Sequence, residues 1–149
     1  MKRVFAIIIA LFMLVSILPI AGNATETVET VYFDDGSYMI IEINYSPARE
    51  TWSITGKKQY TYYDSNSISQ WKAVLTGTFS YTGTSSSCTS SNVDVSINDS
   101  DWYVISKSAS KSGNKATGSA TIGEKVLGVT VTKVPVSLSL ECDADGNLS

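Results

Sequence analysis

The chain of 149 residues carries 11 Lys and Arg against 14 Asp and Glu, no His, and a formal net charge of −3. The absence of histidine excludes nucleophile activation by a Ser-His-Asp or Cys-His arrangement and removes a common zinc ligand. The acidic balance also excludes a typical nucleic-acid binder, because neutralising phosphate supplies most of that affinity.

The N-terminus has the three parts of a secretory signal peptide. Two basic residues precede an apolar run over 4–20, and Gly22 and Ala24 place small residues at the −3 and −1 positions of a cleavage site. We expect cleavage between Ala24 and Thr25 and release of the chain from the cell. An uncleaved membrane anchor is the alternative, but the run is at the short end of the roughly 17–25 residues that a spanning helix needs.

Removal of residues 1–24 leaves 25–149, a single domain of 125 residues that is long enough to bury its own core. This part of the chain has nine basic and 14 acidic residues, hence a net charge of −5. An acidic surface argues against binding to anionic lipid. We therefore expect a secreted protein that does not associate with the membrane once the signal peptide is removed.

Apolar and polar residues alternate along the first half of this domain, which is typical of antiparallel strands. The pattern predicts a hairpin over 28–45 with its turn at 34–37, a strand over 52–63, a turn over 64–67 and a strand over 71–81. Most aromatic residues lie on one side of the alternation. They are therefore predicted to fill the core: Trp52, Tyr60, Tyr62, Trp71 and Phe79.

The second half continues with shorter strand signals. The pattern predicts a Ser/Thr-rich loop over 84–91, a strand over 93–97, a turn over 98–101, a strand over 102–108, and a turn over 111–115. Small residues then alternate along 116–122, where a neighbouring sheet can approach closely. Apolar residues are odd-numbered from 127 to 131 and even-numbered from 134 to 142, so a bulge is predicted near Lys133, beside Pro135.

These patterns predict an all-β fold of eight or nine strands. We expect an antiparallel β-sandwich, with a β-barrel as the alternative. Tyr63 and Tyr103 each stand next to a better core candidate, Tyr62 and Trp102, and so fall on the solvent side of their strands. They are the candidate ligand contacts.

Cys88 and Cys142 are the two cysteines of the chain. An even number of cysteines in an oxidising compartment predicts one disulfide. It would close a loop of about 55 residues, for which chain entropy predicts roughly 4 kcal/mol of stabilisation. A reactive thiol pair is the alternative, but the spacing is far from C-x-x-C. The second cysteine lies on the apolar side of its strand and is expected to be buried.

Three pairs of aspartates lie in predicted turns, at positions 34 and 35, 99 and 101, and 143 and 145. A carboxylate-based glycosidase needs two such groups across a cleft at about 5–10 Å. Turn formation explains these aspartates more simply, because Gly, Ser or Asn stands beside each pair. The last pair resembles the start of a calcium loop without its twelfth-position acid, so a terminal turn is predicted, with no metal and no cofactor.

Three stretches, YTYYDSNSISQWKAVLTGTFSYTGTSSSCTSS, SKSASKSGNKATGSAT and VPVSLSLECDADGNLS, carry a resemblance that covers most of the chain from about residue 50 onward. The chain resembles a family of small, signal-peptide-bearing, β-rich exported proteins of Gram-positive anaerobic bacteria. No activity is assigned to that family, so no catalytic residue is carried over. The resemblance implies a bacterial host, a paired Cys88 and Cys142, and a natural end at Ser149. It also implies no glycosylation at the three sites that fit the N-x-S/T pattern, Asn44, Asn98 and Asn147.

The favoured function is therefore a non-enzymatic extracellular binding module. Its ligand would be a glycan, an envelope polymer or a protein. A secreted antibacterial toxin or antagonist is one alternative, suggested by size and export. A carboxylate-based hydrolase is the other, and it depends on two of the aspartates meeting in a cleft.

Overall fold

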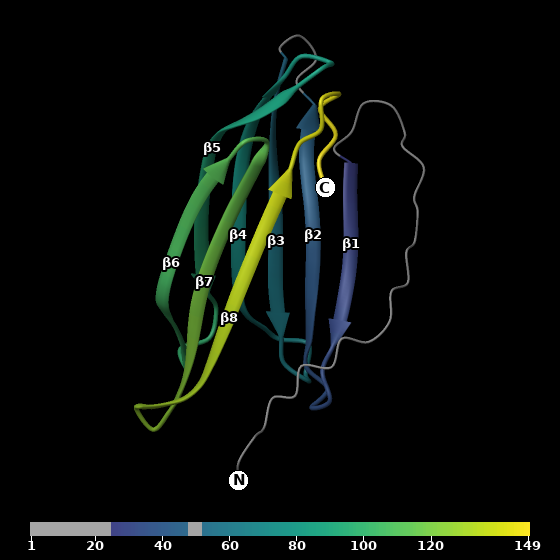
Figure 1. Ribbon diagram of the computed structural model, residues 1–149. Helices are drawn as coiled ribbons and strands as arrows, with labels where there is room; N and C mark the ends of the chain where they lie inside the picture. The colour runs from purple at the N-terminus through teal and green to yellow at the C-terminus, as the bar shows by residue number, and fades with distance from the viewer. Residues whose placement is uncertain (1–24, 48–51) are drawn as a thin grey trace.

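The computed structural model describes residues 25–47 and 52–149, which form eight strands (Figure 1). The predicted signal peptide, including Ala24 at the predicted cleavage site, lies outside the described residues. The strands are β1 (Thr25–Tyr32), β2 (Tyr38–Pro47), β3 (Ser53–Tyr63), β4 (Ser69–Tyr81), β5 (Ser86–Ile97), β6 (Trp102–Ser112), β7 (Lys115–Val126) and β8 (Val129–Glu141). Within the described part of the chain, no helix has the length and apolar character needed to cross a bilayer.

The strands form two sheets, each in chain order. Strands β1 to β5 make a five-stranded sheet and β6 to β8 a three-stranded sheet, with every neighbouring pair antiparallel. The smaller sheet packs on β3, β4 and β5, which gives a sandwich-like arrangement of two layers (Figure 1). The predicted all-β antiparallel class is confirmed. Strand β1 contacts only β2 among the named strands, so the larger sheet extends past the smaller one.

The core lies between the two sheets and follows the predicted alternation. On β4, Trp71, Leu75 and Phe79 are fully buried, while the residues between the buried positions are more exposed. The even-numbered apolar residues of β8 pack against them from the other sheet, and Cys142 is fully buried just beyond that strand. This one-sided burial is what a two-layer antiparallel fold requires.

Small residues on β7 let the two sheets approach closely, as the sequence predicts. Ala116 and Ala120 are buried, and Gly118 lies between them. A Cβ atom added to Gly118 would lie 2.2 Å from Cγ2 of Val93 and 3.2 Å from Cδ1 of Leu75. Side chains of the five-stranded sheet therefore already fill the space that a larger residue would need.

Three predictions about individual positions or segments are wrong: the loop over 84–91, the core position of Trp52 and the strand at 127. The segment 84–91 is not a loop throughout, because β5 begins at Ser86 and pairs with β4. Serines and threonines carry no apolar alternation, so only backbone pairing reveals this part of the strand. Trp52 is not a core residue: it precedes β3 and is 67% exposed, with its ring edge-on to that of Tyr81.

The predicted change of phase near Lys133 is a β-bulge, so that prediction is confirmed. The register between β7 and β8 skips Val131, and a second bulge between β6 and β7 skips Ile105. Leu127 and Gly128 form the turn between β7 and β8, with φ angles of 50° and 79°. The predicted strand segment at 127 is thus a turn, because the pairing of Val126 with Val129 leaves only two residues between the strands.

We predict that Gly118→Ala lowers the free energy of unfolding by about 1–3 kcal/mol, the usual effect of overpacking a filled core. An alanine normally favours a strand over glycine, so the sign of the effect reports the clash with Val93. Urea denaturation measures it. Ser119→Ala, at the next and exposed position, is the control and should stay within about 0.5 kcal/mol of the wild type. Equal stability of the two variants would contradict the close approach.

Candidate functional site

Three tyrosines form a row across the outer face of the five-stranded sheet. Tyr38 on β2 pairs directly with Tyr63 on β3 and with Tyr32 at the end of β1. Directly opposed residues of antiparallel strands share a face of the sheet. The neighbouring Tyr62 stacks on buried Trp71, at 5.4 Å between ring centroids, and so marks the inner face. The three tyrosines therefore lie on the solvent side, as predicted for Tyr63.

The rings of this tyrosine row are packed against one another. The Tyr38 and Tyr63 rings are stacked, with centroids 4.9 Å apart and an interplanar angle of 9°. The Tyr32 ring lies 5.8 Å from that of Tyr38 at 41°. The Tyr38 ring lies between the other two and presents mainly its edge and hydroxyl group, while the Tyr63 ring has one face covered by the stack. Tyr32 is 74% exposed and is the ring with the most free surface.

Polar side chains continue this outer face beyond the tyrosines. Gln59 Nε2 donates to Glu42 Oε2 at 2.6 Å and to the Thr61 hydroxyl at 3.2 Å. Further along the same face, the hydroxyl groups of Thr55 and Thr78 are 3.0 Å apart. The outer face therefore carries an aromatic row at one end and hydrogen-bonding groups along its length.

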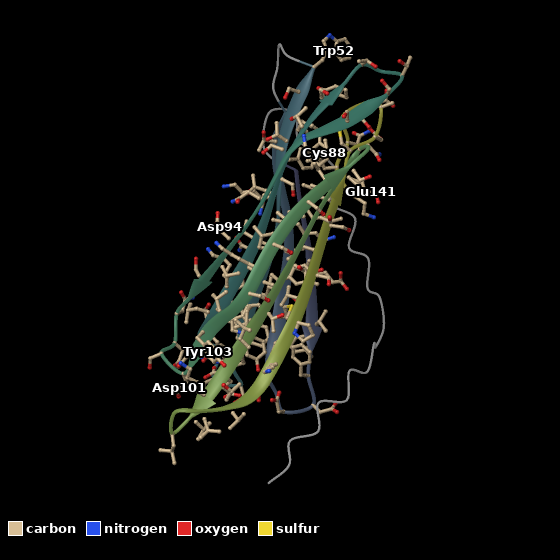
Figure 2. All side chains as sticks on the ribbon, turned by 60° about the vertical axis from the view of Figure 1, so that its left-hand side comes forward. Trp52, Cys88, Asp94, Asp101, Tyr103 and Glu141 are labelled. Carbon is tan, nitrogen blue, oxygen red and sulfur yellow. The ribbon has the colours of Figure 1, made fainter. Side chains whose placement is uncertain are left out.

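Tyr103 lies on the outer face of the other sheet, so the structure does not bring the two candidate contacts together. Its ring covers Gly123, where an added Cβ would lie 2.6 Å from Tyr103 Cε1. The Lys125 ammonium stands 4.2 Å from the ring centroid, and the Tyr103 and Thr130 hydroxyl groups are 2.5 Å apart. Tyr103 is thus half-buried by its own sheet, and only part of it can meet a ligand (Figure 2).

Cys88 and Cys142 are both buried, as expected for the second of them, but they are free thiols. The predicted disulfide is therefore not formed in this structure. Each sulfur instead has its own backbone acceptor: Cys88 Sγ donates to Ser90 O at 3.2 Å and Cys142 Sγ to Asp143 O at 3.4 Å. Burial raises the pKa of both thiols, and the Asp143 carboxylate raises that of Cys142 further.

The three aspartate pairs form turns, as the sequence predicts. Asp35 Oδ1 accepts the Ser37 N–H at 3.0 Å, and Asp99 Oδ1 accepts the Asp101 N–H at 2.8 Å. Asp143 accepts bonds from the Asn147 side chain and backbone, which lower its pKa. The described residues contain no group of three His, Cys, Asp or Glu side chains placed to hold a metal ion.

Two members of the tyrosine row, Tyr32 and Tyr38, are absent from the candidates that the sequence suggests. The available signal is that Tyr38 stands on the side of its strand opposite Met39 and Ile41, as Tyr63 stands opposite Tyr62. The alternation gives the side of each strand but not the register between strands. Only the register of β1, β2 and β3 makes the three rings neighbours.

No protein-family model, curated protein or solved structure matches this chain. The resemblance to exported proteins of Gram-positive anaerobes therefore stays a prediction.

We predict that the reduced protein loses stability as the pH rises above about 8.5, where thiols of an unfolded chain begin to ionise. Burial raises the pKa of Cys88 and Cys142 in the folded state, so above that pH the folded state binds more protons than the unfolded state. The free energy of unfolding then falls with increasing pH. Denaturant titrations under reducing conditions at several pH values measure the slope. The double variant Cys88→Ala, Cys142→Ala is the control and should show a shallower fall, while an identical slope would contradict the prediction.

Proposed function

We propose that the protein is a non-enzymatic, extracellular binding module that uses the outer face of its five-stranded sheet. The observation that carries this proposal is the tyrosine row, an aromatic surface that the core does not need. Exposed tyrosines supply large, rigid contact area and a hydroxyl group at little cost in conformational entropy. The aspartates act in turns, which supports a binding role over the hydrolase alternative.

The chemistry of this face fits a carbohydrate polymer of the cell envelope best among the three ligand classes. A sugar ring has an apolar side, which can lie on an exposed aromatic ring, and hydroxyl groups around its edge. Tyr32 offers the ring surface, while Glu42 and Gln59, and Thr55 and Thr78 further along the face, offer donors and acceptors. The hydrogen-bonding groups that continue the face beyond the tyrosines suit an extended chain of such units.

We predict that Tyr32→Ala weakens binding to insoluble peptidoglycan or to a purified wall polysaccharide by about tenfold or more, the loss typical of an aromatic anchor. Sedimentation of the protein with the polymer measures this loss. Tyr32→Phe should retain most of the affinity, because it keeps the ring.

Trp52→Ala is the matched control, since Trp52 is also an exposed aromatic residue but lies outside the tyrosine row. It should leave binding unchanged. If no polymer binds the wild type, or if the Tyr32→Ala and Trp52→Ala variants bind alike, the tyrosine row is not the contact surface.

We also propose that Cys88 and Cys142 form a disulfide after export. Their backbone N–H groups donate to the carbonyl groups of the consecutive residues Gly113 and Asn114, at 2.7 and 3.1 Å. The Asn114 side chain donates to Cys142 O at 2.8 Å. Both cysteines belong to one buried cluster, so the same turn holds the two backbones close to each other. This proximity supports pairing in an oxidising compartment.

The proposed disulfide between Cys88 and Cys142 leads to a separate prediction. Protein collected after export should have no free thiol on denaturation, and reduction should lower its free energy of unfolding by roughly 4 kcal/mol. Thiol titration and urea denaturation, with and without reductant, measure the two effects. The Cys88→Ala, Cys142→Ala variant should be insensitive to reductant. Two free thiols in the exported protein would rule the disulfide out.

A further inference from the structure

Exposed apolar side chains gather at one end of the three-stranded sheet. Ten large apolar or aromatic residues are exposed in the described part of the chain, and six of them belong to the start of β6 or to the β7–β8 hairpin. We call these six residues the apolar tip: Val104, Ile105, Val126, Leu127, Val129 and Val131. Leu127, at the turn, is 100% exposed. Large exposed apolar clusters of this kind mark interaction sites in monomeric proteins.

The backbone departs from regular geometry at three points of the apolar tip, and each departure brings an apolar side chain to the surface. Ile105 and Val131 are the residues that the two bulges leave unpaired, and they are 41% and 55% exposed. Bulges commonly re-aim a side chain at a functional position. Leu127 has a φ of 50°, in the left-handed region that favours Gly or Asn. A leucine there is costly for the turn, and its exposed side chain gains nothing from the core, so folding does not explain it.

Along the β7–β8 hairpin, apolar side chains at the turn are followed by an aromatic and a basic side chain. Leu127 and Val129 lie at its end, and the next level holds the Tyr103 ring with the Lys125 ammonium 4.2 Å above it. The Tyr103 hydroxyl contacts that of Thr130. In Figure 2, Tyr103 and Asp101 mark this level, and the side chains of the hairpin end extend beyond them. An apolar end followed by tyrosine and lysine is the order found at a membrane interface.

Charges of both signs surround this level. Two acidic residues stand near Lys125 in the chain or across the strands: its backbone N–H donates to the backbone carbonyl of Asp101 at 2.7 Å, and Glu124 precedes it on β7. This combination of a basic and two acidic residues matches a lipid headgroup that carries both a positive and a negative charge. It gives no excess of positive charge for anionic lipid.

A second copy of the chain is a poorer occupant. A stable protein interface uses roughly 20–30 residues of all kinds on each side, so the six residues of the apolar tip would form only a small part of one. The hairpin is also a projection rather than a groove: in Figure 1 its turn points away from the ends of β1 to β4. A narrow convex end suits insertion into a soft apolar layer, which needs no matching shape.

We propose that the apolar tip inserts into the boundary between headgroups and acyl chains of a zwitterionic lipid surface. Leu127, Val126 and Val129 would enter the apolar layer, and Tyr103 and Lys125 would lie among the headgroups. The expectation of no membrane contact was based on net charge, which tests only electrostatic attraction. This surface is separate from the tyrosine row and does not depend on the proposed function.

The test is co-sedimentation of the chain from Thr25 to Ser149 with phosphatidylcholine vesicles, at low and high salt. The wild type should bind, with little dependence on salt. Leu127→Asn should reduce the affinity by about tenfold or more, because it removes the most exposed apolar side chain. Asparagine tolerates the left-handed conformation, so this variant should unfold at the same temperature as the wild type or higher. Loss of binding could not then be attributed to misfolding.

Val28→Asn is the matched control, because Val28 is an exposed apolar residue on β1, in the other sheet, and its loss should leave binding unchanged. Tyr32→Ala should likewise leave it unchanged, which separates this surface from the tyrosine row. The proposal is overturned if the wild type does not sediment with the vesicles or if Leu127→Asn binds equally well. Binding only to vesicles containing phosphatidylglycerol, with strong salt dependence, would overturn it too. So would a dimer in solution that Leu127→Asn dissociates, since a second copy would then occupy the tip.

Discussion

The close approach of the two sheets is the constraint on which the rest of the structure depends. It is made possible by Gly118 and Gly56, where a side chain from the other layer occupies the space that a Cβ atom would need. Val93 fills the space at Gly118, and Leu148 and Leu140 fill the space at Gly56. These contacts are close packed, so the separation of the layers cannot change without either a clash or a cavity.

Side chains on the two outer faces and at the ends of the strands do not take part in this packing between the sheets. The three-stranded sheet covers only part of the five-stranded one, and the inner core already takes up Trp71, Phe79 and most of the large apolar residues. Aromatic and apolar residues that remain outside therefore need another explanation. Among the described residues, such side chains cluster in the tyrosine row on one sheet and in the apolar tip on the other.

The C-terminal segment completes the structure by a polar turn instead of a longer strand. Asp143 accepts hydrogen bonds from Asn147, and the turn places the Leu148 side chain over Gly56, where a larger residue would leave no room for it. The same region holds Cys142 next to the β6–β7 turn. A disulfide to Cys88 would thus fasten the end of β8 to β5, joining the two sheets at the place where the chain finishes.

By itself, the sequence determined which side faces the core on the strands with clear alternation, β4 above all. The alternation of apolar and polar residues predicted that Trp71 and Phe79 are buried and that Tyr63 lies outside. The small residues of β7 predicted the close contact between the sheets. Both predictions were possible because burial of alternate side chains is a local property of a strand. Tertiary structure decided which strands are neighbours and in what register. Register made Tyr32, Tyr38 and Tyr63 one surface and turned Leu127 from a strand residue into a turn. Those outcomes depend on the register of backbone pairing between strands, which the alternation along a single strand does not contain.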